Sequence, residues 1–179
     1  MIAADNISVK PHMTNSLVVE AMRPGDWEAV LRIYGEGIAT GAATFETATP
    51  SWQSWEAAHL PSARWVAREH GEVAGWAALS PVSRRAAYAG VAEVSVYVAE
   101  ACRGRRVGSA LLERLISESE AKGIWTLQAV VFPENAATLA LHKRFGFREV
   151  GRRERISKLQ GKWRDTMLLE RRSTEVGID

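Results

Sequence analysis

A short apolar strand that runs into a basic, glycine-containing loop constrains this 179-residue chain more than any other feature. Val94–Val98 alternates as a strand does, Arg103–Arg106 is basic, and residues 107–121 repeat apolar side chains with a helical period. The first N–H groups of a helix lack carbonyl partners and lie at the positive end of the helix dipole. The pattern therefore predicts an anion-binding loop between a strand and a helix.

Two other phosphate-binding motifs are absent from the sequence. It contains no GxxxxGK[ST] and no GxGxxG after a strand, which disfavours a nucleoside triphosphatase and a dinucleotide-binding protein. The alternative to a phosphate site at this loop is a solvated, basic helix start.

The segment that follows makes the pattern more specific. An apolar strand, Ile124–Val131, leads into a short helix that starts at Asn135, passes His142 and ends at Gly146-Phe147. A strand, an [RQ]xxGxG-type loop, a second strand and a helix of the form N-x-x-[AS]-x-x-L-[HY]-x-x-x-G-F together resemble the GCN5-related N-acetyltransferase superfamily. The resemblance covers about residues 18–171. It implies an α/β fold whose mixed, mostly antiparallel sheet has about seven strands and about four flanking helices, and acetyl-CoA as the acetyl donor.

A narrower resemblance rests on five further segments. They are Thr44–Thr47, Pro50–Trp55, Ala92–Val98, His142 and Gly161–Asp165. Together they are similar to the phosphinothricin and methionine sulfoximine N-acetyltransferases and to the related arsinothricin enzymes. This similarity implies direct attack of the α-amine of a small amino acid or analogue on the thioester, with general-base assistance, by a homodimer.

The resemblance also implies which residues bind the cofactor. In the superfamily the loop binds the pyrophosphate of acetyl-CoA, and the strand before it hydrogen-bonds the pantetheine arm. Arg106 stands where the family has glycine, and a positive φ at that position would cost a non-glycine residue about 1 kcal/mol. Asn135 is also a candidate helix N-cap. The cofactor-binding residues implied are Val96, Tyr97, Val98, Arg103, Gly104, Arg105, Arg106, Val107, Gly108, Ser109 and Asn135.

Two residues are candidates for proton transfer. Glu93 lies in an apolar strand and shares one face with Ser95 and Tyr97, so we expect a raised pKa. The resemblance implies that Glu93 is the general base; the alternative is a cross-strand ion pair. His142 is implied to be a second base or a group near the thioester sulfur, and the alternative is a packed histidine.

Five residues are candidates for acceptor binding. Arg84 and Arg85 offer guanidinium groups that bind planar or tetrahedral oxyanions in bidentate fashion. The resemblance matches Arg85 to an anion-binding arginine and Tyr88 to its neighbour, whereas an arginine pair in a loop is otherwise usually solvated. Phe45 and Trp163 are candidates for the wall of the pocket.

Composition limits the partners and the compartment. The charge is nearly balanced, with 23 basic and 21 acidic residues, which disfavours a nucleic-acid binder. Cys102 is the only cysteine, so we expect no intramolecular disulfide, no CxxC metal site and a reducing compartment. No stretch reaches the roughly 18 apolar residues of a membrane span, which favours the cytoplasm. We expect one acetyltransferase domain over residues 17–172, an extension over 1–16 and a frayed tail over 173–179.

Regular elements are expected throughout the remaining chain. Asp26 is expected to cap a helix that begins there, and a long strand is expected over Tyr88–Val98. Further elements are a strand over 17–22, a helix from Pro50-Ser51, strands over 65–69 and 73–79, and a final antiparallel pair over 147–156 and 163–169.

Two other functions remain open. One keeps acetyl-CoA and acetylates a protein amino terminus, a lysine or a polyamine, although Arg84-Arg85 does not suit a polyamine, whose site should be acidic. The other is a coenzyme-A-binding module without catalysis, for which Arg106 is the hint.

Overall fold

A single mixed sheet organises the computed structural model, which describes residues 17–178. Its strand order is β1-β2-β3-β4-β5-β7-β6, and only the β4–β5 pair is parallel. The strands are β1 (Val18–Ala21), β2 (Arg64–Glu69), β3 (Glu72–Pro81), β4 (Val91–Val98), β5 (Thr126–Val131), β6 (Arg148–Leu159) and β7 (Lys162–Arg172). The α-helices are α1 (Trp27–Ala39), α2 (Trp52–Ala58), α3 (Val107–Ala121) and α4 (Ala136–Arg144). The expected mixed, mostly antiparallel fold is therefore confirmed.

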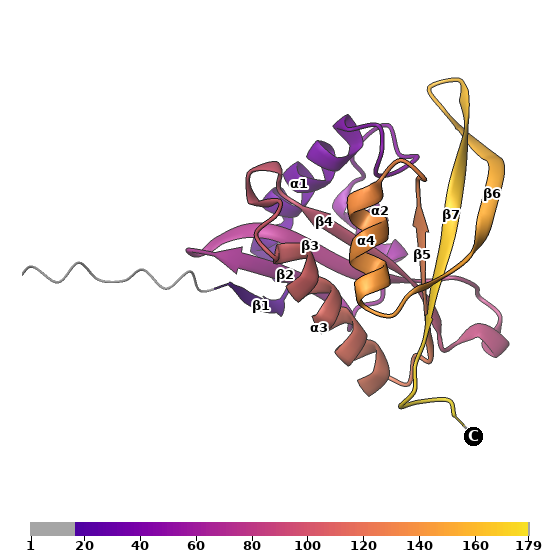
Figure 1. Ribbon diagram of the computed structural model, residues 1–179. Coiled ribbons are helices and arrows are strands. Elements are labelled where there is room, and N and C mark those ends of the chain that lie inside the picture. The colour runs from indigo at the N-terminus through magenta and orange to yellow at the C-terminus, as the bar shows by residue number, and fades with distance from the viewer. Residues whose placement is uncertain (1–16, 179) are drawn as a thin grey trace, which may run out of the picture.

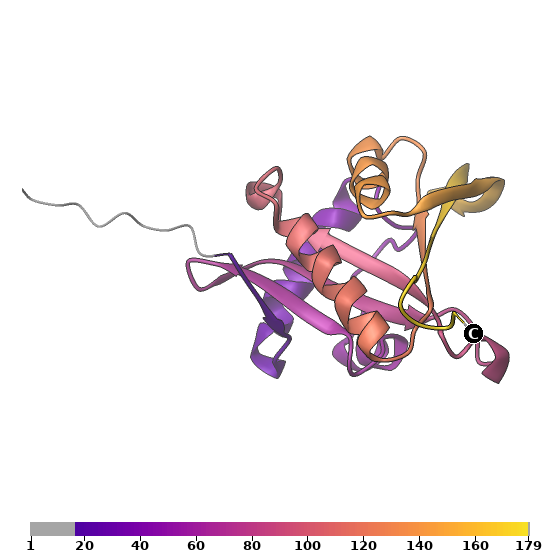
Figure 2. The same ribbon diagram turned by 60° about the horizontal axis from the view of Figure 1, so that its bottom comes forward.

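Helices cover both faces of the sheet (Figures 1 and 2). On one face Leu111, Leu112 and Leu115 of α3 are fully buried against β2, β3 and β4. On the other face α1 and α2 bury Val30, Ile33, Trp55 and Trp76 in a second, aromatic-rich core. Because both faces are covered, β3 is buried along most of its length, in keeping with its apolar sequence.

The parallel pair β4–β5 separates soon after it begins. Its register runs from Val91↔Thr126 to Glu93↔Gln128, whereas β4 continues to Val98 and pairs with β3 along that length. β5 pairs with β7 along its whole length, and beyond Gln128 β7 is the one strand beside it in the described sheet. The edge of β4 from Val94 to Val98 therefore has no strand beside it on the β5 side.

The C-terminal hairpin β6–β7 projects from the body of the molecule (Figure 1). Its turn places Gln160 and Gly161 at positive φ, and β6 is the edge strand of the sheet. Apolar side chains are exposed on this hairpin: Val150 at 45%, Ile156 at 50% and Trp163 at 56%.

Three local expectations are corrected by the structure. Asp26 precedes α1, but its carboxylate accepts from the Arg23 N–H (2.8 Å) and pairs with Arg68 (2.5 Å), so it does not cap the helix with a hydrogen bond. Tyr88 lies in a 3-10 turn (Ala86–Tyr88), because the chain enters β4 only at Val91. Residues 173–177 are not frayed: Ser173 is buried, and Arg172 donates to the carbonyls of Val176 and Gly177.

Two further expectations concern the start of the chain and membrane spans. The proposed extension over residues 1–16 lies outside the described residues. Across residues 17–178, none of the helices is long and apolar enough to cross a membrane.

Candidate active site

A hollow of about 710 Å³ lies where β4 ends and α3 begins. Its walls come from the last residues of β4, the loop before α3, the first turn of α3, one side of α4 and residues 40–43 after α1. Ten of the eleven residues expected to bind cofactor line it, together with His142. The structure thus brings these residues together around one hollow, and their role in cofactor binding stays a prediction.

The loop before α3 folds into a cradle of backbone N–H groups. Gly104 (φ 76°) and Arg106 (φ 67°) both adopt left-handed conformations, which turns the chain sharply before the helix. The first intrahelical bond is made by the Ala110 N–H to the Arg106 carbonyl. The N–H groups of Val107, Gly108 and Ser109 therefore point out of the helix start, where its dipole favours an anion.

Gly108 lets the start of α3 pack closely against its neighbours. A Cβ on Gly108 would lie 3.3 Å from Leu141 Cδ2 and 3.5 Å from Val98 Cγ2. Because glycine leaves that space free, α3 starts close to both α4 and β4. The unpaired edge of β4 opens into the same hollow, with Val96, Tyr97 and Val98 on its wall. An extended ligand arm can replace the missing strand by hydrogen-bonding this edge.

Asn135 joins two walls of the hollow. Its side-chain oxygen accepts from the Thr138 N–H (3.2 Å), so it caps α4 as expected, and its amide donates to the Ala42 carbonyl (3.2 Å). Arg164 of β7 donates to the Gly41 carbonyl (3.3 Å) and pairs with Glu134. The segment after α1 is thereby fixed across the start of α4.

Glu93 lies at the point where β4 and β5 part. It is the last β4 residue paired with β5, it is half-buried, and it lies opposite Ser80 of β3. Desolvation raises the pKa of its carboxyl above the usual 4.5, and the charge of Arg153 opposes this only in part. The expected raised pKa is confirmed. Glu93 does not line the hollow described above, so the structure places it beyond the inner end rather than in the cradle.

His142 is buried in α4, with 3% of its surface exposed. Its Nδ1 lies 2.9 Å from the Thr138 carbonyl, which can only accept, so Nδ1 carries the hydrogen. Burial lowers the pKa of the imidazole, and the Thr138 bond opposes this shift. The ring is therefore neutral near pH 7, and its Nε2 is a buried acceptor for which no hydrogen-bond partner is found within residues 17–178.

The expected acceptor residues lie at the other end of β4, in the β3–β4 loop (residues 82–90). Arg84, Arg85 and Tyr88 are exposed, and the Arg85 guanidinium lies 5.7 Å from the centre of the Tyr88 ring. At about 3.3 Å per residue, β4 separates this loop from the cradle by roughly 23 Å. The structure thus brings these three residues near the start of β4 and not into the hollow.

Three other predicted residues also lie outside the hollow. Arg105 pairs with the buried Glu69 (2.9 Å), so its guanidinium is not on the wall, and the geometry does not support cofactor binding by this side chain. Phe45 packs edge-on against Phe132, with 4.8 Å between ring centres. Trp163 lies exposed on the β6–β7 hairpin beside Lys158.

Sequence reasoning missed Arg144, which lines the hollow from the last turn of α4. Its guanidinium donates to the Ser109 hydroxyl (2.6 Å) and so adds positive charge beside the start of α3. Only its position in a basic helix end could have indicated it, because the contact with α3 spans 35 residues.

Comparisons with known proteins agree with this geometry. Residues 27–147 match the family described as "Acetyltransferase (GNAT) family". YwnH of Bacillus subtilis (strain 168) is 38% identical over 151 residues, which cover 82% of this chain and 93% of YwnH. Phosphinothricin N-acetyltransferase of Alcaligenes faecalis is 33% identical over 162 residues, covering 86% of this chain and 81% of that protein. The crystal structure of a GNAT superfamily phosphinothricin acetyltransferase from Sinorhizobium meliloti in complex with AcCoA superposes with a TM-score of 0.81 at 27% identity, covering 91% of both chains.

The left-handed conformation of Arg106 gives a prediction about stability. Arg106→Gly and Arg106→Ala both remove the guanidinium, but only glycine adopts φ 67° without a steric cost. We expect the glycine variant to have the larger free energy of unfolding, by about 1 kcal/mol, in urea titrations. Arg103 is the matched control: its φ is −64°, so Arg103→Gly should be no more stable than Arg103→Ala. Equal stabilities of the two variants at position 106 would contradict the argument.

Proposed function

The chain belongs to the GNAT acetyltransferase family, and from this premise we propose that it transfers the acetyl group of acetyl-CoA to the α-amine of a small amino acid analogue. Phosphinothricin, methionine sulfoximine and arsinothricin are the acceptors we propose to test. The observation that carries the proposal is the parting of β4 from β5 after Glu93, with the anion cradle at the far end of the open edge. Acetylation of such an inhibitor would make the protein a resistance determinant.

The donor fits the hollow in chemistry as well as in shape. The N–H groups at the start of α3 suit a pyrophosphate, and Arg103, Arg106 and Arg144 add positive charge on the same wall. The free edge of β4 suits an amide-containing arm such as pantetheine, which would run from the cradle toward Glu93. In this proposal acetyl-CoA supplies a thioester carbonyl at the inner end, where the strands part.

The acceptor is proposed to bind at the β3–β4 loop. Arg84 and Arg85 would bind its carboxylate or phosphinate, because guanidinium offers two parallel hydrogen bonds to such groups. The stacking of Arg85 near Tyr88 supports a defined orientation of this cation. The acceptor amine would then lie near the start of β4, two or three residues from Glu93. For Phe45 and Trp163, which lie outside the hollow, a role in the wall of the acceptor pocket stays a prediction from the sequence.

Proton transfer is assigned to Glu93. Its carboxylate would accept a proton as the amine forms a bond to the acetyl carbon, and the carbon–sulfur bond would break. The sulfur gains the proton that leaves the amine, directly or through Glu93, so the products are an N-acetyl amino acid and a free thiol. His142, neutral and with a bare Nε2, would act as a second base, or accept a hydrogen bond from the S–H of the thiol that leaves.

Positioning accounts for more of the rate than Glu93 does. Holding amine and thioester in attack geometry can lower the barrier by about 7–11 kcal/mol, whereas a general base contributes about 10²–10⁴-fold, or roughly 3–5 kcal/mol. The cradle and the β4 edge are therefore the parts on which activity depends most.

We also propose that the enzyme is a homodimer, one domain over residues 17–172, and cytoplasmic. Support for the dimer comes from exposed apolar side chains on the projecting hairpin, Val150 and Ile156 on the edge strand β6 and Trp163 on β7, because exposed apolar groups, above all on an edge strand, favour association. A second copy of the chain would cover them.

The proposed activity is tested by following thiol release from acetyl-CoA with a panel of acceptors. We expect turnover with phosphinothricin, methionine sulfoximine or arsinothricin, and none with their N-acetylated forms, which lack a free amine. Turnover only with peptides or polyamines would contradict the proposed acceptor, whereas acetyl-CoA would remain the donor. Binding of coenzyme A by calorimetry without turnover on any acceptor would contradict catalysis, and no binding at all would contradict the donor site.

Replacing the proposed base gives a pH-dependent prediction. Glu93→Gln should lower kcat/KM by about 10²–10⁴-fold near neutral pH. Because desolvation raises the pKa of Glu93, wild-type activity should rise as pH passes upward through that value, where the base loses its proton. The variant should lack this rise, and its deficit should shrink at high pH, where the acceptor amine is already neutral. Glu149→Gln, at an exposed carboxylate paired with Lys143, is the control and should leave the profile unchanged. A wild-type profile in Glu93→Gln would remove Glu93 from the mechanism.

The dimer proposal is tested by sedimentation. The wild-type particle should have about twice the chain mass of 19.7 kDa, and Ile156→Glu should reduce it to a single chain because a charge replaces an apolar contact. Glu154→Gln, on the same exposed strand, should leave the dimer intact. A wild-type protein that sediments as one chain would refute the homodimer.

A further inference from the structure

The β3–β4 loop has little internal support for the role proposed for it. Every residue from Arg84 to Ala89 is exposed. Its hydrogen bonds are local: the Tyr88 N–H donates to the Arg85 carbonyl (2.9 Å), and the Ala89 N–H donates to the Ala86 carbonyl (3.0 Å). An exposed loop of this kind needs an anchor at its end if its cations are to meet an acceptor in a fixed place.

That anchor is Trp125, the residue before β5. The Gly90 carbonyl, at the end of the loop, accepts from the N–H groups of Trp125 (2.9 Å) and Thr126 (3.0 Å). Gly90 also lies directly against the indole: a Cβ there would fall 2.1 Å from Trp125 Cε3. The loop can therefore move at this end only if Trp125 moves.

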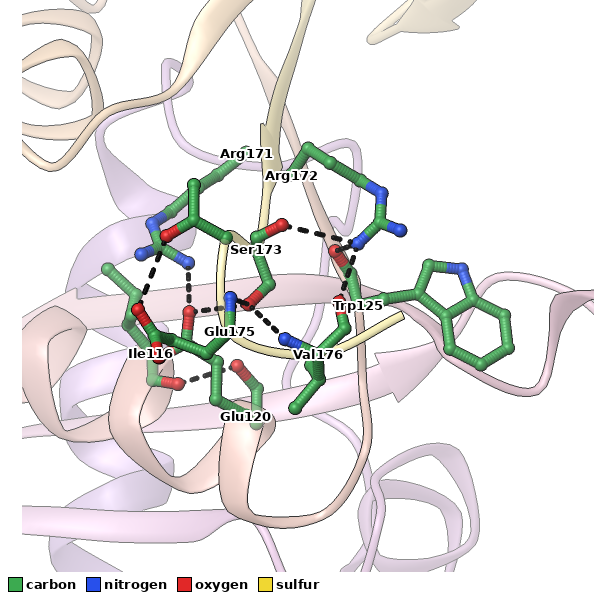
Figure 3. Close-up of polar contacts among 10 residues, drawn as sticks. Ile116, Glu120, Trp125, Arg171, Arg172, Ser173, Glu175 and Val176 are labelled. Atoms are coloured by element: carbon green, nitrogen blue, oxygen red, sulfur yellow. Dashed lines mark hydrogen bonds and ion pairs between the residues drawn. The ribbon is translucent and has the colours of Figure 1, made fainter. Parts of the chain in front are cut away.

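The C-terminal segment holds Trp125 from another side (Figure 3). The Trp125 carbonyl accepts from the Ser173 N–H (2.8 Å) and from Arg172 Nη1 (2.9 Å). The same Arg172 guanidinium donates to the carbonyls of Val176 (2.9 Å) and Gly177, which bends the segment back. A Cβ on Gly177 would lie 2.8 Å from Trp125 Cβ, so the returning chain packs against this residue.

A partly buried side-chain cluster ties this segment to α3. The Ser173 hydroxyl donates to Glu120 Oε1 (2.9 Å) and accepts from the N–H groups of Glu175 (3.0 Å) and Val176 (3.2 Å). Arg171 donates to the same Glu120 oxygen (2.9 Å). Figure 3 shows Arg171 and Glu120 on one side of the segment and Arg172 with Trp125 on the other. The bend is thus fixed to a helix of the main core.

We propose that residues 172–177 and Trp125 form a clamp that holds the β3–β4 loop in the position required for acceptor binding. Arg172 is then a positioning residue: it acts on the acceptor through Trp125 and Gly90 and does not touch it. This inference rests on the proposed function, since it takes Arg85 in that loop to bind the acceptor's anionic group.

The clamp is tested by steady-state kinetics on Arg172→Ala and Gly177→Ala, two changes that release the segment in different ways. Both should raise the acceptor KM about tenfold while kcat and the KM for acetyl-CoA change less than about twofold, because only ground-state placement of the acceptor is lost. Hydrogen exchange of the Tyr88 and Ala89 amides should become faster in both variants. Arg148→Ala is the matched control: this exposed arginine pairs with Glu170 on the same hairpin and should change none of these values.

A double-mutant cycle separates the clamp from the acceptor site itself. In an Arg85→Ala background, which should itself raise the acceptor KM, Arg172→Ala should add less than about a twofold further rise, because its effect passes through the loop. The clamp alone would be overturned by the following pair of results. Arg85→Ala would raise the acceptor KM, whereas both clamp variants would keep the wild-type KM and the wild-type hydrogen exchange. An unchanged KM in Arg85→Ala would overturn the acceptor site, and the clamp's role in binding with it.

Discussion

The site depends on one interruption of hydrogen bonding, the parting of β4 from β5 after Glu93 and Gln128. A sheet normally satisfies both edges of an internal strand, and buried backbone groups left without partners are costly. Here the edge of β4 from Val94 onward has no strand beside it on the β5 side, and its last three residues, Val96–Val98, line the hollow. The fold thereby keeps a row of backbone donors and acceptors available for a ligand, and β3 and β7 supply the pairing that keeps the two parted strands in place.

The cradle at the end of β4 is shaped by a few residues of unusual backbone conformation or small size. Gly104 and Arg106 turn the chain through left-handed conformations, and Gly108 lets α3 start against α4 and β4. Arg106 adds positive charge at a positive-φ position that glycine would adopt without strain, so the loop combines a steric cost with an electrostatic gain. Arg144 adds a cation from a different helix. The cations beside the start of α3 therefore come from the adjacent loop and from α4, which lies about 35 residues further along the chain.

Much of the fold could be predicted because its signals are local. The helical period of residues 107–121, the Asn135 cap and the turn near Gly161 each depend on neighbouring residues, and the structure confirms them. The contacts that sequence reasoning missed are long-range: Arg105 pairs with Glu69, Arg144 with Ser109, and Asp26 with Arg68. An arginine can reach several partners, and no local pattern says which one folding brings near. The same reason explains the tail, whose order comes from Trp125 and Glu120 in other elements.

The hollow and the β3–β4 loop lie at opposite ends of β4, and this separation has a kinetic consequence for the proposed reaction. Each reactant of the proposed reaction has its own binding site, so coenzyme A need not dissociate before the amino acid acceptor binds. Both can be held together along one strand, with the bond exchange taking place between them near Glu93. This layout favours a ternary-complex mechanism, in which the acetyl group passes directly between the two bound reactants and no acyl-enzyme intermediate forms.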